Sequence, residues 1–204
     1  MLNRRHFIST GFAIGVIGPR MANAHAQKDD YVLPEEYLPR EVRMSDDFPA
    51  GEIHVEPNRF ALYLTLPEKR AIRYTVGVGR GNLYHSGTYY VGAKREWPSW
   101  KPTPAMMKRE PSAYRNFEEG GRYEKGMPGG INNPLGARAL YLYTGKGDSY
   151  LRIHGTNAPR TIGTAVSNGC ARLVNEHVID LYNRVPVGTK VVLYPKANAG
   201  PAHS

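Results

Sequence analysis

A two-residue alternation of side chains constrains the fold of this chain more than any other feature of its sequence. Leucines alternate with other residues along 61–66, and bulky apolar residues alternate with others along 72–78. This period is that of a β-strand with one buried face. The polar, turn-like residues 67–70 between the two runs predict a hairpin. Further strand-like runs lie at 88–91, 138–143, 150–154 and 189–194. The pattern therefore predicts a mainly β fold.

One helix is predicted, near the C-terminus. Asn175 is a good N-cap, and Val178, Leu181 and Val185 recur at helical spacing before the Pro-Val-Gly run at 186–188 ends the pattern. Elsewhere 22 Gly and 16 Pro favour turns over long helices. A chain of 204 residues with 41% hydrophobic content can form the core of one domain. We therefore expect a single domain.

Cys170 is the only cysteine, and its run Ser-Asn-Gly-Cys-Ala-Arg suits a tight turn better than a core strand. A lone cysteine in an exported protein is either an inert buried side chain or a reactive thiol. His154 lies 16 positions upstream, at the end of a predicted strand. A thiol and an imidazole on facing segments are the minimum for nucleophilic cysteine catalysis, because the thiolate attacks and the imidazole creates it.

A zinc site is an alternative use of the same residues, with Cys170, His154 and His177 as ligands. The sequence has neither an H-E-x-x-H nor a C-x-x-C pattern. We therefore expect no metal here.

The His-Gly-Thr run at 154–156, followed by Ser-Asn-Gly-Cys-Ala-Arg at 167–172, resembles the catalytic segment of the YkuD-type (ErfK/YbiS-like) L,D-transpeptidases. The similarity covers about 51–194, with further matching blocks at 87–104, 129–142 and 186–191. It implies a single-domain β-sandwich or mixed sheet of the L,D-transpeptidase catalytic type, with one short helix after the catalytic cysteine and no cofactor.

The resemblance implies a function that spacing alone does not. L,D-transpeptidases attack a tetrapeptide stem of bacterial peptidoglycan, release D-Ala, and pass the acyl group to an amine on another stem or on an envelope protein. By this resemblance Cys170 is the nucleophile that forms a thioester, and His154 is the proton carrier. Water as the acceptor would instead make an L,D-carboxypeptidase or an amidase. A non-catalytic peptidoglycan-binding module is a further alternative.

Five neighbouring residues complete the candidate site. Backbone N–H groups at Asn168 and Gly169 would contribute to an oxyanion hole, and a carbonyl near Gly155 would orient the imidazole. By the resemblance, Ser167 matches a Ser or Thr of the family, and Arg172 binds a substrate carboxylate or braces the turn. Asn168 stands where many members have His.

The segment 94–130 has no regular pattern, and a loop of this length is uncommon unless it is functional. We expect at most one short helical turn in it, at 106–109. Trp97 and Trp100 would be the rigid, substrate-contacting members of a lid over the cysteine. The alternative is an ordered surface insertion with structural tryptophans.

Residues 1–26 are typical of a signal peptide, with an Arg-Arg pair, an uncharged stretch and small residues before a cleavage point after Ala24 or Ala26. The arginine pair resembles a twin-arginine signal, and an ordinary secretory signal is the alternative. We expect the mature protein in the periplasm. Its predicted parts are a polar linker or N-terminal arm at 27–50, the catalytic domain at 51–195, and a disordered tail at 196–204.

The formal net charge of +9 suits an acidic partner such as peptidoglycan stem peptides. The sequence has no dense Lys/Arg block with interleaved aromatic residues, so nucleic acid is not an expected partner. Its uncharged N-terminal stretch is too short and too weakly apolar for a transmembrane segment. We expect a monomer.

Overall fold

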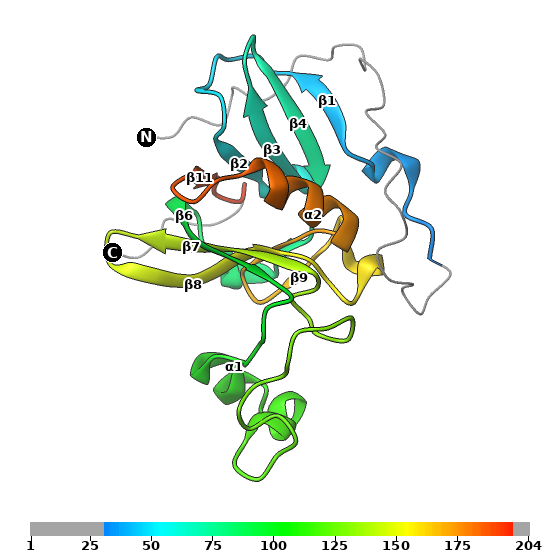
Figure 1. The fold of residues 1–204 in the computed structure, drawn as a ribbon, viewed down its shortest axis with the longest axis vertical. Helices are drawn as coiled ribbons and strands as arrows, with labels where there is room; N and C mark the ends of the chain where they lie inside the picture. The colour runs from blue at the N-terminus through cyan, green and yellow to red at the C-terminus, as the bar shows by residue number, and fades with distance from the viewer. Residues whose placement is uncertain (1–30, 198–204) are drawn as a thin grey trace.

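The computed structural model describes residues 31–197 (Figure 1). Nine strands form one mixed sheet in the order β1-β4-β3-β2-β11-β6-β7-β8-β10. They are β1 (Arg40–Arg43), β2 (Ile53–Glu56), β3 (Ala61–Leu66), β4 (Arg70–Thr75), β6 (Gly87–Glu96), β7 (Arg138–Thr144), β8 (Gly147–His154), β10 (Ala171–Arg172) and β11 (Lys190–Leu193). A second, two-stranded sheet pairs β5 (Val78–Gly79) with β9 (Ala165–Ser167). The prediction of a mainly β fold is confirmed.

The helices are short. They are α1 (Pro104–Arg109), α2 (Asn175–Arg184) and the 3₁₀ turns η2 (Glu35–Tyr37), η3 (Pro57–Arg59), η4 (Gly81–Leu83), η5 (Pro111–Phe117) and η6 (Pro159–Thr161). In residues 31–197 no helix is both long enough and apolar enough to span a bilayer. The predicted signal peptide at 1–26 lies outside the described residues.

The predicted hairpin is present as β3 and β4, which pair antiparallel with Leu64 opposite Ile72. Strand β1 extends this half of the sheet by pairing antiparallel with β4. Residues 40–43, which the sequence places in a linker or N-terminal arm, thus belong to the sheet edge. At the other end of the chain, Lys196 Nζ donates a hydrogen bond of 2.5 Å to the Gly79 carbonyl.

Strand β11 lies in the middle of the sheet although it is the last strand in the sequence. It pairs parallel with β2 on one side, with Val191 opposite Ile53. On its other side it pairs antiparallel with β6, with Val191 opposite Tyr89. This strand therefore joins the N-terminal strands β1–β4 to the strands that carry the candidate site.

Helix α2 lies over one face of the sheet (Figure 1). Its Val178, Leu181 and Val185, the last at its C-cap, are fully buried in the main apolar core with Leu140 of β7. The predicted N-cap is one residue too late, because Val174 is the N-cap and Asn175 is the first helical residue. The Asn175 side chain instead accepts hydrogen bonds from the N–H groups of Ala137 (2.9 Å) and Thr156 (3.3 Å).

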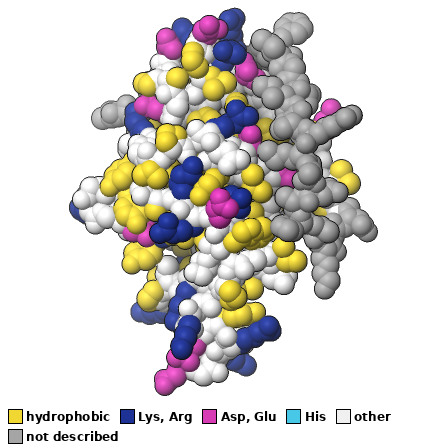
Figure 2. Space-filling view, viewed as in Figure 1, with side chains coloured by type: hydrophobic (Ala, Val, Ile, Leu, Met, Phe, Trp, Pro, Cys, Tyr) yellow, Lys and Arg dark blue, Asp and Glu magenta, His cyan; other side chains and the backbone are white. Residues whose placement is uncertain are grey.

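The residues 97–137 between β6 and β7, called the insertion here, extend away from the sheet (Figure 1). The turn expected at 106–109 is present as part of helix α1, but the expectation of at most one turn is wrong, because η5 follows it. At its base, Trp100 and Met127 exchange backbone hydrogen bonds of 2.9 and 2.7 Å. Four aromatic rings pack inside it, those of Trp100, Tyr114, Phe117 and Tyr123. Its outer surface carries both charge types, with Lys and Arg side chains prominent (Figure 2).

Candidate active site

The parallel pairing of β8 and β10 brings the predicted catalytic residues to one face of the sheet. Arg172 lies opposite His154, and Ala171 lies opposite Ile153. Ile153 and Ala171 point into the core. Because side chains alternate along a strand, His154 and Arg172 point to the other face, and Cys170 follows the same parity.

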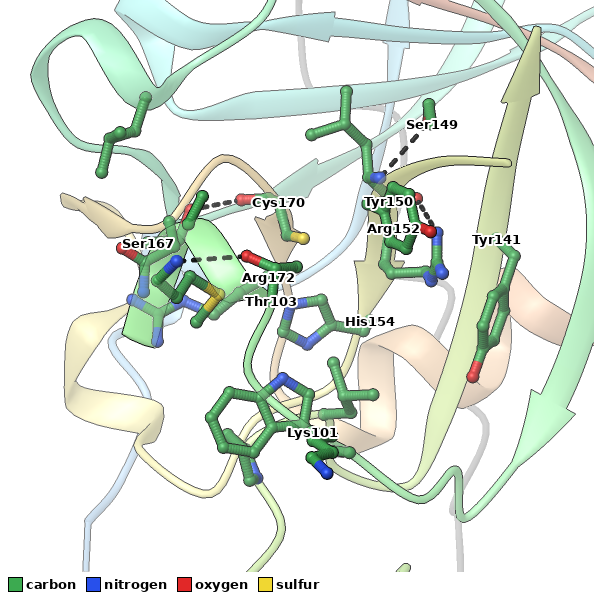
Figure 3. A pocket seen from close by; sticks show the side chains of 18 of the residues that line it. Lys101, Thr103, Tyr141, Ser149, Tyr150, Arg152, His154, Ser167, Cys170 and Arg172 are labelled. Carbon is green, nitrogen blue, oxygen red and sulfur yellow. Dashed lines mark hydrogen bonds between the residues drawn. The ribbon is translucent and has the colours of Figure 1, made fainter. Parts of the chain in front are cut away.

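That face opens into a pocket of about 510 Å³ that contains both Cys170 and His154 (Figure 3). Cys170 is partly exposed. The sheet contributes Tyr141, Arg152 and Arg172 to the pocket, among others. The insertion contributes Ser99, Trp100, Lys101, Thr103, Ala105, Met106, Arg109, Pro134 and Leu135. The site therefore has two walls, one from the sheet edge and one from the insertion.

His154 is held as a neutral imidazole. Its Nδ1 lies 2.6 Å from the Gly155 carbonyl oxygen. A carbonyl only accepts hydrogen bonds, so Nδ1 carries the proton and Nε2 keeps its lone pair. Burial lowers the pKa of His154 to about 3, the Arg172 charge acts in the same direction, and the Gly155 carbonyl opposes the shift. The imidazole can therefore act as a base through Nε2.

The Cys170 thiol is also neutral at rest. Burial raises its pKa, while the backbone N–H of Arg152 and the charges of Arg152 and Arg172 act against that shift. A depressed histidine pKa and a raised cysteine pKa both oppose charge separation. Burial of the two groups therefore favours a neutral thiol and imidazole over a preformed ion pair.

Ser167 and Gly169 close the turn that presents Cys170. The Ser167 hydroxyl donates to the Cys170 carbonyl (2.6 Å) and accepts from the Gly169 N–H (3.2 Å). Gly169 has a φ of +123°, and a Cβ there would lie 2.8 Å from the Leu83 carbonyl oxygen. Only glycine fits this position. The Gly169 N–H, a predicted oxyanion donor, is thus already used within the turn.

Arg172 places a cation in the pocket wall. Its Nε is buried and has no hydrogen-bond partner within residues 31–197. The backbone of Arg172 is fixed by mutual hydrogen bonds with Gly77 of 2.8 and 2.9 Å. The charged residues that line the pocket are Lys101, Arg109, Arg152 and Arg172, and no Asp or Glu of the described chain joins them. This wall suits a carboxylate.

The two candidate tryptophans lie in different places. Trp100 lines the pocket and packs edge-on against Phe117, with ring centroids 5.0 Å apart. Trp97 does not line it. Its N–H donates to the Ala137 carbonyl (2.8 Å), and its own carbonyl leaves no room for a Cβ on Gly129. Trp97 shapes the base of the insertion.

Arg152 is a site residue that the sequence reasoning missed. It forms paired hydrogen bonds of 2.6 and 2.8 Å with Asp148, and its guanidinium lies 4.0 Å from the Tyr141 ring centroid. Arg152 precedes His154 by two residues, so strand parity alone places both on one face. That signal was available in the sequence.

The zinc alternative is not supported by the described residues. His177 lies on α2 with its ring centroid 6.4 Å from that of Tyr74, and it does not line the pocket. Within residues 31–197 no three His, Cys, Asp or Glu side chains gather in a way that would hold a metal ion.

Sequence comparisons agree on one family. The model of the YkuD family, described as the L,D-transpeptidase catalytic domain, matches residues 50–193. The chain is 33% identical over 157 residues to the "Probable L,D-transpeptidase ErfK/SrfK" of Escherichia coli K12, an alignment that covers 76% of this chain and 47% of that protein. The chain spans about half the length of the curated relatives it matches.

Solved structures show the same fold. A Brucella melitensis protein described as a "Probable carnitine operon oxidoreductase caia" is 44% identical, with a TM-score of 0.53, 80% of this chain and 96% of that chain covered. The Ldtfm–avibactam carbamoyl enzyme is 16% identical with a TM-score of 0.52, and 73% of this chain and 50% of that chain are covered. The second likeness shows the fold alone.

Proposed function

We infer the function of this chain from its family, because it belongs to the YkuD family of L,D-transpeptidase catalytic domains. We propose that it is a cysteine acyltransferase that uses a peptidoglycan tetrapeptide stem as its acyl donor. The observation that carries this proposal is that one pocket holds both His154, at the end of β8, and Cys170, in the turn directly before the adjacent strand β10.

Acylation would begin with the neutral pair. His154 Nε2 takes the thiol proton as Cys170 Sγ attacks the carbonyl carbon before the terminal D-Ala. The negative charge goes to the carbonyl oxygen. Cys170 N–H has no hydrogen-bond partner within the described chain, so it is the best placed donor for that oxygen, with Asn168 N–H beside it. The C–N bond then breaks, the imidazolium protonates the leaving amine, and a thioester remains.

Transfer would repeat these steps in reverse. His154 Nε2 takes a proton from the incoming amine, which attacks the thioester carbonyl, and the C–S bond breaks. The sulfur leaves as a thiolate and recovers the proton from the imidazolium. The Gly155 carbonyl keeps Nδ1 protonated throughout, so the same nitrogen serves both half-reactions.

The charge of the pocket supports an anionic donor. The Nε of Arg172 is buried and has no hydrogen-bond partner within residues 31–197, and the lining contains Lys and Arg but no Asp or Glu of those residues. A peptidoglycan stem carries carboxylates, and a guanidinium binds a carboxylate by paired hydrogen bonds. We assign Arg172 to this contact and Trp100 to the apolar side of the pocket. The proposed place of action is the periplasm, with an amine of another stem or of an envelope protein as acceptor.

Intact-mass spectrometry after exposure to a carbapenem tests the nucleophile. We expect one covalent adduct on the wild-type protein and none on Cys170→Ala. His154→Ala should retain the fold and form the adduct about 10²–10⁴ times more slowly. A folded wild-type protein with a titratable thiol and no adduct would overturn the assignment.

A second assay separates transfer from hydrolysis. The protein is incubated with a tetrapeptide donor and an amine acceptor in H₂¹⁸O. A peptide-linked product supports the transpeptidase, and ¹⁸O in a tripeptide carboxylate identifies water as the acceptor. Binding of the tetrapeptide with neither product would identify a binding module.

A further inference from the structure

The side chain of Asn168 joins the catalytic turn to the insertion. Its Oδ1 accepts hydrogen bonds from Arg109 Nη2 (2.9 Å) and Arg80 Nη2 (3.4 Å). Its Nδ2 donates to the Tyr114 hydroxyl (3.1 Å). Arg109 belongs to α1 and Tyr114 to η5, so both helical parts of the insertion contact one side chain of the turn.

A carboxylate of the insertion strengthens this junction. Glu110 forms an ion pair with Arg80, which lies between β5 and η4 on the body of the domain. The same carboxylate lies 3.6 Å from Arg109 Nε. The two arginines that meet Asn168 Oδ1 therefore share one carboxylate, which offsets one of their two positive charges. The junction, defined here as Asn168, Arg80, Arg109, Glu110 and Tyr114, consists of polar contacts only.

The insertion behaves as one packed unit behind this junction. The Phe117 ring lies 5.0 Å from that of Trp100 and 5.5 Å from that of Tyr123. Its inner side supplies Met106 and Arg109 to the pocket. A unit with its own packing moves as a whole, so its position relative to Cys170 depends on its attachments.

A second attachment lies at the base of the insertion. There Asn157 Nδ2, on the body of the domain, donates to the Asn132 carbonyl at 2.9 Å, and within the insertion Asn133 Nδ2 donates to the carbonyls of Met127 and Pro128. These contacts hold the end next to β7. Near the catalytic turn, α1 and η5 are held by the junction instead.

We propose that the Asn168 side chain is a positioning residue that holds the insertion against the catalytic turn and so sets the width of the pocket. An amide suits this place because one end accepts from guanidinium groups and the other donates to a hydroxyl. The role is separate from that of the Asn168 backbone N–H, which every side-chain variant retains. The proposal deepens the function proposed above and rests on it only where turnover is measured.

Limited trypsin cleavage tests the attachment without any assay of activity. The insertion carries six basic residues. Lys101 precedes Pro102, which blocks trypsin, so the sites available for cleavage follow Lys108, Arg109, Arg115, Arg122 and Lys125. Cleavage tracks the population of the opened form when opening is fast. We expect trypsin to cut the insertion of Asn168→Ala about 5- to 30-fold faster than that of wild type. The reason is that each hydrogen bond lost should raise the population of the opened form by a few-fold. Asn183→Ala, at an exposed position of α2, is the matched control and should match wild type.

Two more variants make this test specific. Asn168→Asp keeps the acceptor for both arginines, so its cleavage rate should stay within about 3-fold of wild type. Tyr114→Phe removes only the hydroxyl partner. If the junction is a unit, the Asn168→Ala/Tyr114→Phe double variant is cut no faster than Asn168→Ala alone. Additive increases, or no increase for Asn168→Ala, would overturn the proposal.

Steady-state kinetics with the tetrapeptide donor provides the functional readout. A wider pocket should raise KM for Asn168→Ala about 5- to 30-fold with kcat within about 2-fold, as expected when uniform binding is lost. A fall in kcat at unchanged KM and unchanged cleavage would assign the side chain to transition-state stabilisation instead. If wild type itself does not turn over the tetrapeptide, the function proposed above fails, and trypsin cleavage still decides the role of Asn168.

Discussion

The two walls of the pocket are built by different physical means. The sheet wall consists of β8 and β10, whose inner faces are fully buried at Ile153 and nearly so at Ala171, with 0% and 5% exposure. The insertion wall stands on a small aromatic cluster in which Phe117 is buried and its neighbours remain partly exposed. Strand register and the apolar core hold one wall, whereas a small aromatic cluster, backbone hydrogen bonds at its base and side-chain hydrogen bonds to the catalytic turn hold the other.

The two walls therefore carry different functions: one holds the residues proposed to be catalytic, and the other holds residues that would contact the substrate. His154 and Cys170 lie on the wall that cannot shift without breaking the core. Met106, Arg109 and Trp100 lie on the wall that the insertion forms outside the main apolar core. Groups that move protons need positions fixed to a fraction of an ångström, whereas a substrate wall tolerates adjustment.

Truncation of the sheet core should have the largest effect. Leu140 of β7 is fully buried between the sheet and α2. We expect Leu140→Ala to reduce the free energy of unfolding by about 2–5 kcal/mol, because it leaves a cavity. Urea unfolding followed by circular dichroism measures this. A loss below about 1 kcal/mol would mean that the sheet wall is less rigid than its burial indicates.

Acidification should have the second largest effect, by lowering the free energy of unfolding of the sheet and α2. Burial lowers the pKa of His177 on α2 to about 4, against about 6.5 in an unfolded chain. Below pH 6.5 the unfolded chain therefore binds the extra proton, so the free energy of unfolding falls as pH drops from 6.5 towards 4, by at most about 3 kcal/mol. His154 acts in the same direction. Urea midpoints between pH 7 and 4.5 should change less steeply for His177→Gln than for wild type.

The same kind of truncation in the insertion should act locally. Phe117→Ala removes the central ring of the aromatic cluster. We expect the free energy of unfolding of the sheet to stay within about 0.5 kcal/mol of wild type, while trypsin cuts the insertion at least about 10-fold faster. If the midpoint instead falls as far as for Leu140→Ala, the two walls unfold together and the comparison fails.

A lysine near the boundary between the regions should have a smaller effect on stability than truncation of the sheet core. Lys94 Nζ donates to the carbonyls of Tyr182 (2.6 Å) and Val185 (2.7 Å) at the end of α2. We expect Lys94→Met to lower the free energy of unfolding by about 1–2 kcal/mol, since both carbonyls lose a charged donor.

Lys101→Met provides the matched control within the insertion, where Lys101 donates to the Glu124 carbonyl. It should leave the urea midpoint unchanged. Equal effects of the two substitutions would show that the boundary between the regions does not lie between β6 and the insertion.

The strands of the sheet could be predicted from the sequence because apolar residues recur along them with a regular period. Alternation located the hairpin of β3 and β4, and the strand-like runs at 138–143 and 150–154 correspond to parts of β7 and β8. Alternation cannot show which strands become neighbours across long loops, so it did not predict the β8–β10 or β11–β2 pairing. The resemblance to a family supplied the pairing of Cys170 with His154 that periodicity could not.

The insertion and the turns were less predictable because their structure depends on contacts between distant residues. Asn175 is typical of an N-cap in sequence, yet its side-chain oxygen accepts hydrogen bonds from the N–H groups of Ala137 and Thr156. Trp97 and Trp100 lie in the same irregular stretch of sequence, and nothing in that stretch distinguishes them, but only Trp100 lines the pocket. Strand β1 carries mixed charges and no alternation, and it belongs to the sheet only through its pairing with β4.

The central place of β11 has a consequence for how the chain folds. Residues 190–193 must pair with both β2 and β6 before the nine strands form one sheet. Until they arrive, two partial sheets each present an unpaired edge, which is a template for aggregation. Pairings this far apart in sequence also slow folding. We therefore expect assembly of the sheet to be limited by its C-terminal strand, late in folding, and the protein to be most prone to aggregation just before that step.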